Sequence, residues 1–363
     1  MAKFTIGTAE MKKAMSFIDP MLKNGIDSQP RILFIVEDKI TASATNGEAY
    51  AKIQFDADIE EKGKFVISGV VFMNILKAFK GEKIAISSDE NRVEIVSGTL
   101  SFRTSIIDGR EEYFEAPMFE NAGTFKVNSK ELKNAISSVS CCIDQSKQHL
   151  NCVLFQSVEE EKGKIFVVAT DGMRLGIDSV SGSYENEVPN LLVPKKSADI
   201  IVSMLGDIET EITVKYTDSM VQIEISGMTY TSKLLETAFP KYRSVIPTAN
   251  DKILEVKTKD LLTNIKSVAS ASQITFRIKL AISKDKTDIS CEDNGTDGSS
   301  SVESTYSDAQ PLDMVCNYNL LSSILEKIDS TLVRIQIANA ESPILIKPLD
   351  NDNLQYVFMP FVQ

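Results

Sequence analysis

The sequence is nearly devoid of histidine, a common catalytic and metal-binding residue. Among its 363 residues there is one histidine, His149, and there is no tryptophan. It contains no Walker sequence, no G-x-G-x-x-G and no G-x-S-x-G, which are motifs of nucleotide-binding and hydrolytic enzymes. A Ser-His-Asp or Cys-His site would have to include His149. We therefore expect a protein that is not an enzyme and that uses no metal and no cofactor.

Long apolar runs are also missing. No window approaches the roughly 20 apolar residues that a membrane helix needs, so no membrane association is expected. The start, Met1 to Ile6, lacks the apolar region of a secretory signal, which favours a cytoplasmic location. Hydrophobic residues make up 43% of the chain, enough to build packed cores.

Cysteines are present in an odd number, five, and none of them forms a C-x-x-C pair. Two of them, Cys141 and Cys142, are adjacent and lie in an apolar stretch. This pattern is typical of reduced, mostly buried thiols and not of a zinc site or a disulfide framework.

One pattern recurs three times along the chain: a short run of alternating apolar residues followed by a helical period. The runs begin at Phe4, Phe125 and Leu254. Each run ends at a hydroxyl residue that we predict to cap the following helix, namely Thr8, Ser129 and Thr258. A second helix per repeat is predicted at 70–79, 195–205 and 319–328, each time after an apolar strand.

Turn signals recur in phase with these segments. Asn46-Gly47, Asp171-Gly172 and Asn294-Gly295 each lie between apolar alternating runs and predict hairpin turns, because such turns need positive φ. The Gly- and Ser-containing segment 292–301 is expected to be a mobile loop tip. Together the features predict three similar α+β domains at 1–121, 122–250 and 251–363, each with two helices packed on antiparallel sheets. The alternative is a coincidental α+β pattern without true repeats.

The net charge of −12 argues against ordinary nucleic-acid binding, which leaves a basic footprint. The predicted helices, however, hold more lysine than acidic residues, and local potential governs binding. We expect these helices to contact phosphate without sequence preference. The alternative is that helices favour lysine on solvated faces. The candidate DNA-facing residues are Lys12, Lys13, Lys23, Lys77, Lys80, Lys130, Lys133, Lys195, Lys196, Lys259 and Lys266.

Three motifs resemble a known family. They are the segments 168–175 (VATDGMRL), 239–247 (FPKYRSVIP) and 356–360 (YVFMP), and they are similar to the bacterial DNA polymerase III beta subunit, the sliding clamp. The resemblance implies the DNA-clamp fold and a head-to-tail homodimeric ring. Such a ring encircles double-stranded DNA and confers processivity on the replicative polymerase.

The resemblance also implies one pocket for short partner peptides. Its partners would be the DNA polymerase III alpha subunit, the clamp loader, and other polymerases and repair proteins. Met173 and Ser244 stand where the family commonly has His or Tyr and Arg, and Phe358 also departs from the usual ending, so a more apolar and less basic pocket is expected. The pocket positions that the resemblance implies, these three departures included, are Leu150, Thr170, Gly172, Met173, Arg174, Leu175, Pro240, Ser244, Val245, Val357, Phe358, Met359 and Pro360.

Other interpretations of these residues remain open at this point. Asp171-Gly172 is equally consistent with a plain hairpin turn, and Leu175 and Val357 with ordinary core positions. The main alternative for the whole chain is a repeat-built interaction scaffold that does not encircle DNA. A scaffold can be monomeric, whereas a clamp must be a dimer. An enzyme would require a nucleophile or metal around His149.

Overall fold

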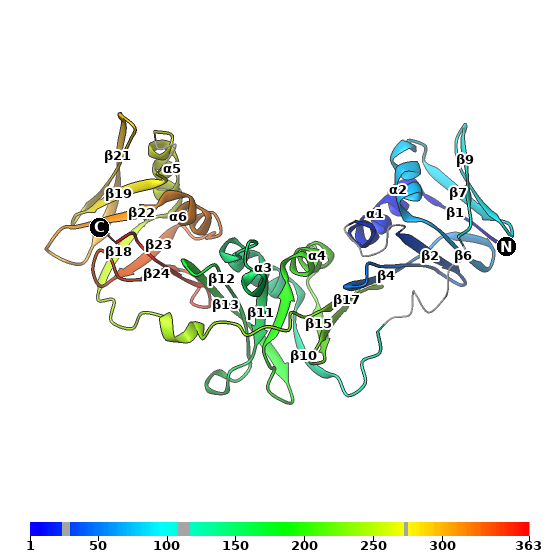
Figure 1. Ribbon diagram of the computed structural model, residues 1–363, viewed down its shortest axis with the longest axis horizontal. Helices are drawn as coiled ribbons and strands as arrows, with labels where there is room; N and C mark the ends of the chain where they lie inside the picture. Colours follow the sequence, from blue (N-terminus) through cyan, green and yellow to red (C-terminus); the bar gives the residue numbers. More distant parts are fainter. Residues whose placement is uncertain (24–29, 108–116, 272–274, 363) are drawn as a thin grey trace. The chain divides into compact units, whose positions relative to one another are not determined.

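The computed structural model describes residues 1–23, 30–107, 117–271 and 275–362. The chain divides into two compact units. The first comprises residues 1–130, 184–186 and 196–234, and the second comprises residues 131–183, 187–195 and 235–363. Figure 1 labels the helices and many of the strands of both units.

The first unit contains two sheets and three helices among its described residues. One sheet has the strand order β5-β1-β7-β8-β9, and in the other β10, β15, β16, β17, β4, β3, β2 and β6 are successive antiparallel neighbours. The strands are β1 Ala2–Gly7, β2 Arg31–Val36, β3 Ile40–Thr45, β4 Ala49–Phe55, β5 Asp58–Glu61, β6 Gly63–Ser68, β7 Lys83–Ser88, β8 Arg92–Ser97, β9 Leu100–Ser105, β10 Gly123–Asn128, β15 Glu211–Tyr216, β16 Met220–Ile225 and β17 Met228–Lys233. The helices are α1 Thr8–Ile18, α2 Gly69–Ala78 and α4 Lys195–Leu205, whose first residue is assigned to the second unit.

The second unit is also built from antiparallel sheets. In one sheet β14, β11, β12, β13, β25, β24, β23, β18 and β21 follow one another, and β21 continues into β20, β19 and β22. The strands are β11 Cys152–Gln156, β12 Lys164–Thr170, β13 Arg174–Tyr184, β14 Leu191–Pro194, β18 Lys252–Lys257, β19 Arg277–Ile282, β20 Lys286–Asp293, β21 Thr296–Tyr306, β22 Leu312–Asn317, β23 Leu332–Ile337, β24 Ile344–Pro348 and β25 Gln355–Phe358. The helices are α3 Ser129–Val139, α5 Thr258–Ala269 and α6 Tyr318–Leu325, with α3 beginning in the first unit.

Short 3-10 turns connect several of these elements. They are η1 Asp19–Leu22, η3 Ser140–Cys142, η4 Gln148–Leu150, η5 Glu159–Glu161 and η6 Tyr242–Val245. Two of them, η4 and η6, carry residues of the predicted peptide site, namely Leu150, Ser244 and Val245.

Each unit has its own apolar core. In the first, Phe34 stacks on Phe65 with ring centroids 5.1 Å apart and meets Phe72 of α2 edge to face. In the second, a cluster of buried side chains includes Leu175, Val357 and Tyr242. Burial of apolar surface is the main stabilising contribution in both units.

The predicted threefold α+β repeat is confirmed. The pairs β1–α1, β10–α3 and β18–α5 reproduce the three strand–helix segments, and α2, α4 and α6 are the three second helices. The predicted helix at 319–328 is α6, which ends earlier, at Leu325. The three predicted hairpin turns also form, with Gly47, Gly172 and Gly295 at φ of 85°, 90° and 77°.

The predicted helix caps are wrong. The hydroxyl residues Thr8 and Thr258 are the first residues of their helices and not the capping residues, and their buried Oγ1 atoms have no partner among the described residues. The Ser129 hydroxyl donates instead to the carbonyl of Ile208 at 2.6 Å. Two of the second helices have side-chain caps. The Ser68 side chain accepts a backbone N–H of α2, and the Asn317 side chain accepts two backbone N–H groups of α6.

The segment 292–301, expected to be a mobile loop tip, consists mostly of strand residues. This segment forms the tip of the β20–β21 hairpin, in which Asp293 pairs with Thr296 and Cys291 with Gly298 across a tight turn. The Asn294-Gly295 turn chemistry therefore outweighs the loop-like Gly and Ser composition.

The five cysteines are free thiols, as predicted, and all but Cys141 are buried. Within the described ranges, no helix combines the length and apolar character needed to cross a membrane.

Candidate functional site

The site predicted from the sequence is organised by the hairpin turn between β12 and β13. The Asp171 carboxylate accepts hydrogen bonds from the backbone N–H groups of Met173 and Arg174, at 2.8 and 2.6 Å. The Thr170 hydroxyl donates to the Arg174 carbonyl at 2.7 Å and accepts from the Gly172 N–H. These short side-chain bonds fix the turn, so Thr170, Asp171 and Gly172 have structural roles of their own.

The C-terminal strand lies directly beside this hairpin. Leu175 pairs with Val357 in the β13–β25 register, and Arg174 pairs with Phe358. Beyond the strand end, the Met359 N–H donates to the Met173 carbonyl at 3.0 Å. Segments about 180 residues apart in the sequence are thus joined by backbone hydrogen bonds.

Leu175 and Val357 belong to one apolar cluster on the same face of the sheet. Both are nearly fully buried, at 3% and 4% exposure, and they pack with Tyr242 and Leu345. Phe239 is partly buried against the same cluster. The rings of Phe239 and Tyr242 meet edge to face at 6.3 Å.

The segment around η6 is held over this cluster by polar contacts. The Tyr242 hydroxyl accepts from the Gln156 amide at 2.6 Å, and burial raises the pKa of Tyr242. The Arg243 guanidinium lies over the Phe166 ring, 4.9 Å from its centroid, and pairs with Glu161 at 3.5 Å. The segment therefore stays close to the sheet although it is not a strand of it.

Several members of the predicted site are exposed. Met173 and Val245 are 44% and 53% exposed, which is unusual for large apolar side chains. Pro240 and Ser244 are exposed as well, and Met359 is half-buried. Leu150, in η4, and Pro360 are buried.

Two of the predicted residues face away from the cluster. Because side chains alternate along a strand, Arg174 and Phe358 lie on the sheet face opposite Leu175 and Val357. Arg174 pairs with Asp171 at 2.8 Å, and its guanidinium also donates to the Ser323 hydroxyl and the Leu320 carbonyl. Phe358 is fully buried. In this structure Arg174 supports the turn and α6.

Several residues at the site were missed by the sequence analysis. Tyr242 and Phe239 lie within the recognised 239–247 motif, so that motif carried a signal for both. Phe166 and Leu345 join the cluster from positions outside the motifs, and only the sheet register reveals them.

The lysines predicted to face DNA are exposed or half-buried, and several are already paired. Lys130 pairs with Glu209 at 2.9 Å, Lys266 with Glu326 at 2.6 Å and Lys23 with Asp19, while Lys12 donates to the Phe79 carbonyl at 2.7 Å. Lys133 and Lys195 also have interaction partners. Those without an ion pair among the described residues are Lys13, Lys77, Lys80, Lys196 and Lys259.

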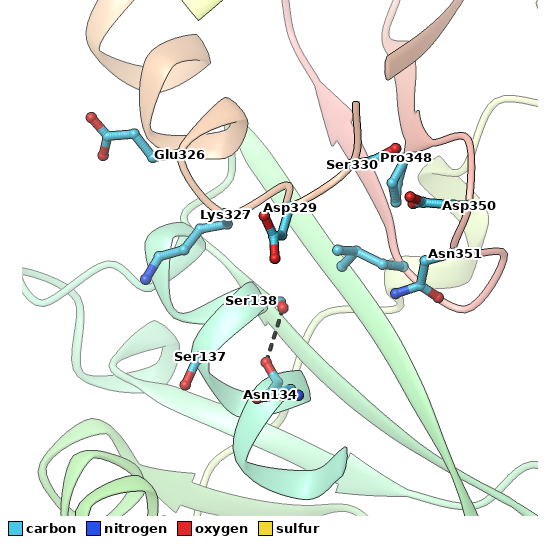
Figure 2. Close-up of a pocket in the computed structure, with 11 residues that line it drawn as sticks. Asn134, Ser137, Ser138, Glu326, Lys327, Asp329, Ser330, Pro348, Asp350 and Asn351 are labelled. Carbon is cyan, nitrogen blue, oxygen red and sulfur yellow. Dashed lines mark hydrogen bonds between the residues drawn. The ribbon is translucent and has the colours of Figure 1, made fainter. Parts of the chain in front are cut away.

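A separate polar cavity of about 360 Å³ lies within the second unit. Figure 2 shows Ser137 and Ser138 of α3 on one side of it and Lys327 and Asp329, which follow α6, on the other. Its lining shares no residue with the predicted peptide site.

The arrangement around His149 does not resemble a nucleophile–base pair. His149 is exposed, and the neighbouring Cys152 thiol donates to its backbone carbonyl at 3.7 Å. Burial raises the pKa of Cys152 to about 12, which disfavours the nucleophilic thiolate.

Comparison with protein families accounts for nearly the whole chain. Residues 2–115, 126–241 and 243–362 match the N-terminal, central and C-terminal domains of the DNA polymerase III beta subunit, in that order. The chain belongs to the DNA polymerase III beta subunit family. Its membership agrees with the three motifs in the sequence and with the threefold repeat in the fold.

Relatives of this beta subunit are distant but similar along their full length. The beta sliding clamp of Haemophilus influenzae is 22% identical over 366 residues, covering 99% of each chain, and that of Rickettsia bellii is 24% identical over 383 residues, again covering 99% of each.

Solved structures show the same fold. A sliding clamp from Bartonella birtlesii bound to griselimycin superposes with a TM-score of 0.91 at 22% identity, covering all of both chains. The DNA polymerase III beta subunit from Thermotoga maritima has a TM-score of 0.89 at 24% identity, also over all of both chains.

Proposed function

We propose that this protein is a DNA sliding clamp, a processivity factor and not a catalyst. Two copies would associate head to tail into a ring around duplex DNA and tether the replicative polymerase to its template in the cytoplasm. The observation that carries the proposal is the end-to-end match of three successive repeats to the three domains of the beta subunit. We propose domain boundaries at 1–121, 122–250 and 251–363.

The charge distribution fits this function better than it fits ordinary DNA binding. The chain carries −12, and several helical lysines are neutralised by carboxylates. A protein that relied on phosphate affinity would need many free cations, and its binding would fall steeply with salt. A ring is retained by topology, so weak contacts suffice and do not impede sliding. Our candidates for these contacts are the lysines that form no ion pair with another described residue, namely Lys13, Lys77, Lys80, Lys196 and Lys259.

The test separates topology from affinity. The protein is loaded by a clamp loader onto nicked circular DNA and washed at high salt, and the circle is then linearised. We expect retention on the circle and release from the linear form. Release from the intact circle at moderate salt would contradict a closed ring, and so would a monomeric mass, close to 40.1 kDa, in sedimentation at micromolar concentration.

We further propose that the apolar cluster between the β12–β13 hairpin, the C-terminal strand and the 239–246 segment docks short peptides of partner proteins. These partners would be the DNA polymerase III alpha subunit, the clamp loader, and other polymerases and repair proteins. The support is the exposure of large apolar side chains on the segments that build a packed apolar cluster: Met173 lies on the β12–β13 hairpin and Val245 in η6, and half-buried Met359 follows β25. Exposed apolar side chains are typical of protein-interaction sites, and residues that become desolvated on binding contribute most of the binding energy.

Met359 offers the cleanest test of the docking site. Its side chain is half-buried and its backbone N–H holds the turn, so Met359→Ala removes side-chain contacts without removing the hydrogen bond to Met173. We expect a polymerase-tail peptide to bind more weakly by about 1–3 kcal/mol. Fluorescence anisotropy measures the Kd, and circular dichroism and sedimentation verify the fold and the dimer. An unchanged Kd in a folded dimer would reject this site and leave the clamp proposal standing.

A further inference from the structure

Outside the docking site, the second unit contains two thiols in contact. Cys141 and Cys142 lie in η3, immediately after α3, with their Sγ atoms 3.8 Å apart. Cys142 is fully buried, whereas Cys141 is partly exposed. The three other thiols, in Cys152, Cys291 and Cys316, are buried.

The surroundings of the pair favour reaction at Cys141 first. Its thiol lies 3.5 Å from the carbonyl of Ser138, and Ser138 and Lys327 line the polar cavity shown in Figure 2. The hydrogen bond from Cys142 lowers the pKa of Cys141 against the opposing effect of burial, and the charges of Arg174 and Lys327 lower it further. Partly exposed thiols beside cations are the reactive ones in proteins.

Cys142 provides the second, protonated sulfur. Burial raises its pKa well above the ordinary value for a thiol. Its Sγ packs against Gly176 of β13, since a Cβ added there would lie 3.3 Å from it. The Tyr356 hydroxyl donates to the same Ser138 carbonyl that faces the Cys141 thiol, at 2.9 Å. Cys142 is therefore held against β13, and the Ser138 carbonyl beside Cys141 is fixed by Tyr356.

We propose that Cys141 and Cys142 form a chelating dithiol site for soft trivalent electrophiles, of which an organic arsenic(III) oxide is the representative. Cys141 attacks arsenic first, and Cys142 then closes the chelate. Two As–S bonds form, the As–O bonds break, and the oxide oxygen leaves as water with the two thiol protons. Neither sulfur nor arsenic changes oxidation state, so no oxidant is required.

Geometry favours a bridging atom over a direct disulfide. A disulfide needs sulfurs about 2.05 Å apart and Cα atoms at least about 4.4 Å apart. Adjacent residues have Cα atoms about 3.8 Å apart, so direct closure would be strained. A large atom inserted between sulfurs that are already 3.8 Å apart avoids this requirement.

The experiment uses the reduced full-length protein and phenylarsine oxide at equimolar concentration. We expect one adduct per chain by intact-mass spectrometry, at a mass increase equal to the reagent less one water, with the loss of two titratable thiols. The adduct should survive excess monothiol, because chelation by two sulfurs resists it, and should be removed by ethanedithiol. A wild-type protein without a monothiol-resistant adduct would overturn the proposal.

Three substitutions assign the site. Cys141→Ser and Cys142→Ser should each abolish the monothiol-resistant adduct, because one thiolate cannot chelate. Cys152→Ser, a buried thiol elsewhere in the same unit, is the matched control and should retain the adduct. Cys141 is the partly exposed member, so Cys141→Ser decides the question if Cys142→Ser proves unstable by thermal unfolding. Retention of the resistant adduct in folded Cys141→Ser would place the chelate elsewhere.

Discussion

The hairpin turn at 45–50 in the first unit and the one at 170–175 in the second are the same turn with different side chains. In both, a threonine hydroxyl donates to the carbonyl four residues later, at 2.8 Å for Thr45 and 2.7 Å for Thr170. In both, the next side chain, Asn46 or Asp171, accepts two backbone N–H groups. The shared Thr–Asn/Asp–Gly chemistry thus specifies a turn and by itself says nothing of function.

Each turn also accepts a backbone hydrogen bond from a neighbouring segment, and the side chains at this contact differ between the two turns. The Lys233 N–H donates to the Glu48 carbonyl at 2.9 Å, as the Met359 N–H donates to the Met173 carbonyl at 3.0 Å. The first turn therefore has Glu48 and Lys233 at the positions where the second has Met173 and Met359. The two turns share their backbone hydrogen bonds. The second turn is a candidate docking site because it has apolar side chains where the first turn has charged ones.

The largest effect is expected from truncating the core beneath the second turn. Leu175 is 3% exposed in a packed cluster, so Leu175→Ala should lower the free energy of unfolding by about 2–5 kcal/mol. Urea denaturation measures this value. Met173→Ala, at an exposed position of the same turn, is the control and should change stability by no more than about 0.5 kcal/mol.

Equal stability of the two variants would mean that Leu175 is not part of the core. The buried position also shows that Leu175→Ala is a poor probe of peptide binding, since it disturbs the fold and the docking site together.

A second contrast concerns a buried carboxylate. When the two hairpins are aligned with Thr170 on Thr45, Asp178 of β13 corresponds to Ile53 of β4, and both are buried. Burial raises the pKa of Asp178 to about 6, opposed by one hydrogen bond from the Ser179 N–H. Between its unfolded pKa of about 3.9 and 6, the folded state binds more protons than the unfolded state. The free energy of unfolding should therefore fall as the pH rises through this window, by up to about 2–3 kcal/mol from this group.

Asp178→Asn tests this pH dependence, because it keeps the shape and removes the titration. The difference in unfolding free energy between wild type and variant should shift in favour of the variant as the pH rises from about 4 to about 7. A difference that stays constant over that range would show that Asp178 does not titrate there.

Short sequence patterns predict local elements such as helices and turns, whereas the pairing of distant strands becomes known only from the structure. The strand–helix segments starting at Phe4, Phe125 and Leu254 and the three glycine turns were predictable, because their signals lie within a few residues. The caps predicted at Thr8 and Thr258 were wrong, because the sequence does not distinguish a hydroxyl residue at the capping position from one at the first helical position.

At the candidate site, motifs located the turn and the C-terminal strand but not the direction of each side chain. Arg174 and Leu175 are neighbours in one motif, yet strand alternation sends them to opposite faces. Phe166 and Leu345 join the cluster through pairings that no motif encodes. Such contacts depend on how the sheet is assembled.

The smallest expected effect comes from converting the second turn into the first. Met173→Glu combined with Met359→Lys installs the acid and base that Glu48 and Lys233 supply in the other turn. Met173 is about half-exposed and Met359 half-buried, so the fold and the dimer should be unaffected. Loss of the two apolar side chains should weaken peptide binding by about 1 kcal/mol each, so by about 2 kcal/mol or thirtyfold in Kd for the double variant.

The control is the reverse exchange in the first unit, Glu48→Met with Lys233→Met, which should leave the Kd unchanged because that turn lacks the aromatic cluster of Phe239 and Tyr242. Fluorescence anisotropy with a polymerase-tail peptide measures both. If the Met173→Glu and Met359→Lys double variant binds as tightly as wild type, the difference between the turns is not what makes the second one a docking site. If it binds at least fivefold more weakly and the control does not, the two methionines are the elements that turn a repeated hairpin into a docking site.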